Sequence, residues 1–165
     1  LKHPSDWQVI AGGKGRQVTF NVPAADGKTT VRVWATADKP IGDETQAEAW
    51  LTETEASATV LTIEPAARTL GTGFQIAYSY RDTAGDSHSG LMVLLNDEQG
   101  TLFTANLQAT PPDTNWLDAE TLSESDGETA QALISGFIVL PDIAHAYDSG
   151  AVGERREVSF GTGRP

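Results

Sequence analysis

The chain has 165 residues, and its 23 acidic and 11 basic side chains give a formal net charge of −12. This excess of negative charge argues against binding to nucleic acid phosphates or to an anionic membrane surface, since both need clustered positive charge. The absence of cysteine excludes disulfides, thiol nucleophiles and cysteine-ligated zinc. No apolar run reaches 18 residues, so we expect no integral membrane segment.

The first part of the chain alternates apolar and polar residues, which is typical of half-buried strands. The dipeptide Asp26-Gly27 favours a tight turn between two such segments. The sequence therefore predicts a short edge strand followed by an antiparallel hairpin. The expected strands are residues 7–10, 17–23 and 30–36.

Residues 43–58 are expected to form a helix. Thr45 and Glu48 have the spacing of a capping box, in which two side chains satisfy free N–H groups at the helix start. Apolar residues then recur at helical spacing, and Trp50 among them is expected to anchor the helix on the sheet.

Strand patterns return after this helix, and the apolar run 91–95 predicts a central strand covered on both faces. Pro65 is expected to end the first of these strands. A second capping box at 125–128 introduces a second amphipathic helix, residues 126–137. The expected strands are residues 60–64, 73–80, 89–96 and 101–110.

These elements predict an α+β fold, with a central antiparallel sheet of about six strands flanked by helices. We expect one domain over residues 1–141 and a polar C-terminal extension over residues 142–165.

Five segments carry a resemblance to a known superfamily: 3–7, 18–23, 73–80, 91–107 and 132–141. Together with the element order, they resemble the PsbP-like superfamily. That group includes extrinsic photosystem proteins, a Ran-binding nuclear import factor, and exported bacterial proteins and lipoproteins. The resemblance implies an α/β/α sandwich that acts as a non-enzymatic binding or assembly module. It carries over no set of functional residues.

Three tryptophans are candidates for a protein interface, because exposed aromatic side chains often anchor such contacts. Trp34 alternates with apolar neighbours and is expected on the opposite face of its strand, and Trp116 lies in a predicted loop after a proline pair. Trp7 is the third candidate. The alternative is that these rings cover edges of the core.

Asp142, His145 and Asp148 would share one face of a helix and form a candidate metal site. The alternative is that the histidines are scattered surface residues.

Residues 86–89 bring a carboxylate, two hydroxyls and an imidazole together in sequence. Neighbouring residues on a strand point to opposite faces, so Ser87 and His88 would not meet. We predict no catalytic residue and no cofactor from this pattern.

The resemblance thus implies a binding or assembly module of the bacterial cell envelope that acts on a protein partner. The resemblance implies a periplasmic or extracellular protein, with a lipid-anchored precursor as one form. Two alternatives stay open: a small hydrolase, and a carrier that holds a small apolar ligand between the sheet and the second helix.

Overall fold

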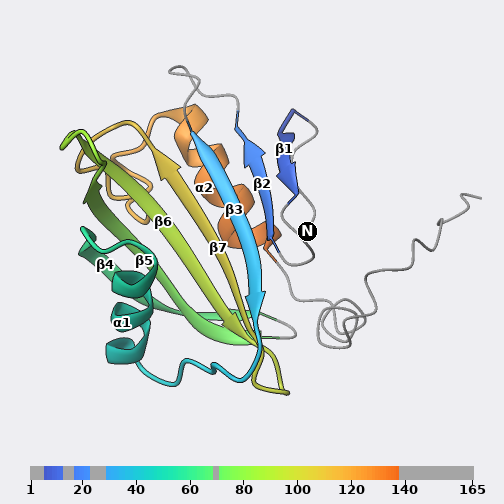
Figure 1. The fold of residues 1–165 in the computed structure, drawn as a ribbon. Coiled ribbons are helices and arrows are strands. Elements are labelled where there is room, and N and C mark those ends of the chain that lie inside the picture. Colours follow the sequence, from blue (N-terminus) through green and yellow to red (C-terminus); the bar gives the residue numbers. More distant parts are fainter. Residues whose placement is uncertain (1–5, 13–16, 23–28, 69–70, 138–165) are drawn as a thin grey trace, which may run out of the picture.

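A computed structural model describes residues 6–12, 17–22, 29–68 and 71–137 (Figure 1). Within these ranges one seven-stranded sheet has the order β1-β2-β3-β7-β6-β5-β4, and every neighbouring pair is antiparallel. This confirms the predicted α+β fold and its antiparallel sheet flanked by helices. The elements are β1 (Gln8–Gly12), β2 (Gln17–Asn21), β3 (Thr30–Thr36), α1 (Glu44–Thr54), β4 (Thr59–Arg68), β5 (Gly71–Arg81), β6 (Ser87–Asn96), β7 (Leu102–Ala109) and α2 (Glu124–Gly136).

The two helices of the described ranges lie on opposite faces of the sheet (Figure 1). The apolar run of β6 reaches both faces, as predicted for a central strand: Leu91, Val93 and Leu95 point toward α2, while Met92 and Leu94 point toward α1. Neither helix is long and apolar enough to cross a bilayer.

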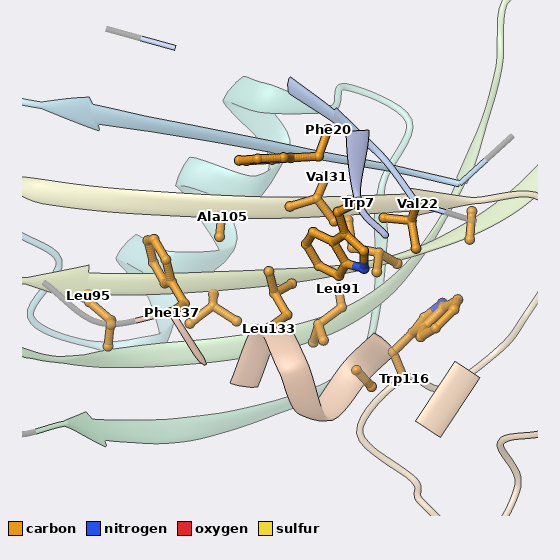
Figure 2. Close-up of a cluster of buried hydrophobic side chains, with 14 of the residues drawn as sticks. Trp7, Phe20, Val22, Val31, Leu91, Leu95, Ala105, Trp116, Leu133 and Phe137 are labelled. Carbon is orange, nitrogen blue, oxygen red and sulfur yellow. The ribbon is translucent and has the colours of Figure 1, made fainter. Parts of the chain in front are cut away.

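The core on the α2 side is the larger of the two (Figure 2). Leu133 and Phe137 extend toward the sheet at the end of α2 and are almost fully buried. Side chains from the sheet and from α2 therefore meet in the space where the carrier alternative would place an apolar ligand. Buried members of this core are Trp7, Phe20, Val22, Val31, Ala66, Leu91, Val93, Leu95, Phe103, Ala105, Leu107, Ala109, Trp116, Ala130, Leu133 and Phe137.

The N-cap of helix α1 lies two residues before the predicted capping box at 45–48. Asp43 is the N-cap, and its carboxylate accepts from the Gln46 backbone N–H at 2.8 Å. The Gln46 side-chain oxygen in turn accepts from the backbone N–H of Gly42 at 2.8 Å. Asp43 has extended backbone angles, so this earlier capping pair is the one at the true helix boundary.

The predicted capping box at 125–128 is displaced in the same way. Ser123 is the N-cap of α2, and its hydroxyl accepts from the Asp126 N–H at 3.2 Å while donating to the Asp126 carboxylate at 2.7 Å. At the other end of α2, Arg68 donates to the Ile134 carbonyl at 2.5 Å. A cation at this position suits the partial negative charge of a helix C-terminus.

The prediction that Pro65 ends its strand is wrong, because β4 continues through it to Arg68. β4 lies at the edge of the sheet and pairs only with β5. On an edge strand, alternate N–H groups face away from the sheet, so a proline there removes no ladder hydrogen bond.

Candidate functional site

The face of the sheet that carries α1 is only partly covered by that helix (Figure 1). α1 packs against residues of β5 and β6 and against Leu102 of β7, whereas β3 and β2 lie beyond it. The pairing of β3 with β7 brings polar and aromatic residues together on this open part of the face. We call it the β3–β7 surface. Its partly exposed residues are Arg32, Trp34, Trp50 and Gln108, and the buried residues beneath them are Tyr78, Thr104 and Asn106.

Two tryptophans border Thr104 on the β3–β7 surface. Trp34 is paired with Thr104 across the strands, and the Trp50 indole N–H donates to the Thr104 hydroxyl at 3.2 Å. Both rings are half-buried. The structure thus brings together one tryptophan that the sequence marked as an interface candidate and one that it assigned to the core.

A cation lies over each of these rings. The guanidinium carbon of Arg32 is 4.8 Å from the centre of the Trp34 ring, and Lys39 Nζ is 5.1 Å from that of Trp50. Such contacts are attractive because the ring face carries partial negative charge. Lys39 also pairs with Glu53 at 3.1 Å. Each ring is therefore held in place by its neighbours.

A buried hydrogen bond lies beside the two tryptophans. The Tyr78 hydroxyl donates to the Asn106 side-chain oxygen at 2.6 Å. The Tyr78 ring lies over Gly90, because a Cβ added at Gly90 would be 2.3 Å from the ring's Cζ. Tyr78 and Asn106 are 0% and 1% exposed, so this contact links β5 and β7 beneath the surface.

Two donors in this region have no acceptor in the described part of the chain. They are Asn106 Nδ2 and Arg32 Nε, both shielded from solvent. Ion pairs between described residues join Lys39 to Glu53 and His88 to Asp82, so the half-buried Arg32 has no carboxylate partner there. Arg32 therefore carries a positive charge without an ion pair to any described residue, within an acidic protein.

Burial raises the pKa of both tyrosines near this site. The pKa of Tyr78 is well above its ordinary value, chiefly through desolvation, and burial followed by the charges of Glu55 and Asp82 raises the pKa of Tyr80 to about 12. The folded chain thus holds these protons more tightly than the unfolded chain. The stabilisation is complete below the ordinary pKa of 10.0 and is lost as the pH rises through the folded value.

We therefore expect the free energy of unfolding to fall as the pH rises above about 10. An ultraviolet titration of tyrosinate absorbance would show late ionisation of Tyr78 and Tyr80, and Tyr80→Phe would remove one late group. Circular dichroism at each pH would confirm that the chain is still folded. Ionisation of both groups near pH 10 in folded protein would contradict the prediction.

The side chains of His88 and Ser89 in the segment 86–89 are engaged in local contacts. His88 contacts the Asp82 carboxylate at 2.9 Å and stacks on Tyr80. The hydrogen bond from His88 is the main cause that lowers the pKa of Asp82. Ser89 is buried, and its hydroxyl donates to the Pro111 carbonyl at 2.6 Å, so it is engaged in holding the fold.

The other candidates from the sequence have different outcomes. Trp7 and Trp116 are 6% and 1% exposed and belong to the α2-side core, so the interpretation of these two rings as exposed anchors is corrected. Apolar neighbours enclose both rings. The positions of Trp7 and Trp116 in the sequence did not reveal these neighbours. The metal candidates Asp142, His145 and Asp148 lie outside the described residues. Within the described ranges, no three His, Cys, Asp or Glu residues are grouped to hold a metal.

Sequence reasoning missed Arg32, Tyr78 and Asn106 as site residues. A signal was present in β7, where Thr104, Asn106 and Gln108 alternate with apolar residues. Three polar residues on one face of a strand that is not at the sheet edge indicate a polar patch inside the fold. Their partner Arg32 became evident only from the pairing of β3 with β7.

No protein-family model matches the chain, and no curated protein matches it. Among solved structures, the chain is similar to PA94 from Pseudomonas aeruginosa, a protein of unknown function, with 13% sequence identity and a TM-score of 0.55. The likeness covers 80% of this chain and 88% of PA94. At this identity the comparison shows a likeness of fold alone.

Proposed function

We propose that this protein is a non-enzymatic binding module that contacts a protein partner through the β3–β7 surface. The observation that carries the proposal is the placement of Trp34 and Trp50 side by side with Thr104, half-exposed and each stacked against a cation. Tryptophan and arginine are the residue types most enriched where interfaces gain their binding energy.

The contacts beneath the surface also favour binding. Trp50 is hydrogen-bonded to Thr104, and Arg32 lies on the Trp34 ring. Side chains that are already ordered lose little conformational freedom when a partner binds. The surface is therefore prepared for contact without rearrangement of the sheet.

Two observations weigh against an enzyme at the segment 86–89. Ser89 has both its donor and its acceptor role filled, by Pro111 and by the Trp116 indole. His88 is hydrogen-bonded to Asp82 and stacked on Tyr80. Neither group is positioned to activate the other.

The PsbP-like relationship and the location in the bacterial envelope are part of the same proposal. Their support is the resemblance of the segments between residues 3 and 141, together with the sheet between helices that this resemblance implies. Fractionation of cells that produce the protein from its natural gene would test the location. Recovery in the cytoplasm alone would contradict it.

A peptide library displayed on phage tests the binding surface directly. Peptides selected on the immobilised wild-type chain should lose at least about tenfold in affinity with Trp34→Ala, since central aromatic residues contribute that much in known interfaces. Gln131→Ala, an exposed change on α2, is the control and should leave affinity unchanged. Amide NMR spectra would confirm that both variants are folded. Peptides that bind both variants as well as wild type would overturn the proposal.

A further inference from the structure

The unpaired donors of the β3–β7 surface lie on residues that face each other across two strands. Arg32 of β3 is the direct pairing partner of Asn106 of β7. Their donors Nε and Nδ2 are shielded from solvent and have no acceptor among the described residues. Buried polar groups in folded proteins nearly always have a partner, so an orphaned pair at one place calls for an explanation.

The chemistry of the missing partner follows from the groups around it. Both orphaned atoms are donors, so the partner must supply an acceptor. The Tyr78 hydroxyl already donates to the Asn106 oxygen, which directs the amide nitrogen away from Tyr78. Arg32 adds a positive charge with no ion-pair partner in the described chain. An acceptor that is also an anion satisfies both requirements, and a carboxylate matches the fork of guanidinium donors.

We propose that Arg32 and Asn106 form a subsite for the carboxylate of an aspartate or glutamate side chain in the partner protein. The neighbouring Trp34 ring then contacts the apolar part of that segment. Arg32 is half-exposed and rests on Trp34. In this proposal the arriving carboxylate draws the guanidinium outward and reaches Asn106 Nδ2. This inference rests on the proposed function and names the chemistry of the partner.

The surrounding charges support a specific subsite. Lys39, the other cation stacked on a tryptophan here, is already paired with Glu53. Glu55, the nearby acid, accepts from the Gln108 amide at 3.2 Å. Arg32 is thus the cation of this surface whose charge is left for a ligand.

A double-mutant cycle with C-terminally amidated synthetic peptides tests this subsite. For an acidic peptide that depends on Trp34, Arg32→Gln is expected to weaken binding at least about tenfold, as loss of a charged hydrogen bond does. Replacing the peptide's acid by its amide should cost a similar factor in wild type and little in Arg32→Gln. Arg81→Gln, which removes an exposed cation outside the β3–β7 surface, is the matched control and should change affinity less than about threefold.

Each result bears on one claim. Peptides that require Trp34 but show no coupling between their acid and Arg32 would overturn the carboxylate subsite and leave the proposed function standing. Peptides whose affinity is unchanged by Trp34→Ala would overturn the proposed function itself. NMR of the Arg32 Nε–H and the Asn106 side-chain amide should show both shifting only with the acidic peptide. Equal shifts with the amide version of the peptide, or an Nε–H bonded to Asn106 in the free protein, would overturn the inference.

Discussion

Gly90→Ala is expected to destabilise the folded chain by about 3 kcal/mol or more, as overpacking of a tight core does. A Cβ at this position would be 2.3 Å from Tyr78 Cζ and 2.5 Å from its hydroxyl oxygen. The ring has no free space to retreat into, since Tyr78 is fully buried and hydrogen-bonded to Asn106 at 2.6 Å. Displacing the Tyr78 ring would leave both the oxygen and the nitrogen of the Asn106 side-chain amide without a hydrogen-bond partner.

Urea unfolding followed by circular dichroism would measure the loss. Gly127→Ala is the matched control, because a Cβ there meets nothing within 4 Å. Gly127 lies inside α2, where alanine is a better helix former, so this control should be neutral or stabilising by up to about 1 kcal/mol. Combining Gly90→Ala with Tyr78→Leu should recover part of the stability by removing the clash. Equal stability of Gly90→Ala and wild type would show that the ring can move at little cost.

Ser89→Ala is expected to lower the free energy of unfolding by about 2 kcal/mol. The Ser89 hydroxyl donates to the Pro111 carbonyl at 2.6 Å and accepts from the Trp116 indole N–H at 2.9 Å. Ser89 and Trp116 are 0% and 1% exposed, so alanine would leave a buried donor without a partner. The change would also loosen the attachment of the segment after β7 to the sheet.

Thermal and urea unfolding would measure this effect, and near-ultraviolet circular dichroism would report on the packing of Trp116. Ser87→Ala is the control, since Ser87 lies two residues away on the same face of β6 but is only half-buried. We expect that change to stay within about 0.5 kcal/mol. If the two serine variants were equally stable, the hydroxyl of Ser89 would not be what holds Trp116.

Local patterns predicted the elements well where one interaction dominates. The run Leu91–Leu95 identified the central strand, because a strand covered on both faces has no polar side. Alternation in 30–36 placed Trp34 on the face opposite Val31, and the pairing with Thr104 agrees with this. Periodicity also identified α1 and α2, although each cap lies two residues before the predicted one.

Errors arose where the answer depends on position within the sheet. Pro65 is tolerated because β4 is an edge strand, and the sequence does not reveal the order of strands. Trp116 is enclosed by apolar residues of the α2-side core, and Ser89, far from it in the chain, accepts its indole N–H. Loop residues near a proline pair are usually exposed, so no local signal marked this ring as core.

The sequence by itself determined an acidic, cysteine-free α+β chain with an antiparallel sheet, because side-chain periodicity and composition act locally. Only the tertiary structure decided the candidate site. Its key contacts join β3 to β7, and Tyr78 of β5 to Asn106 of β7. The meeting of Arg32 with Asn106 depends on strand order and register, and these are set by the packing of the whole sheet between its helices.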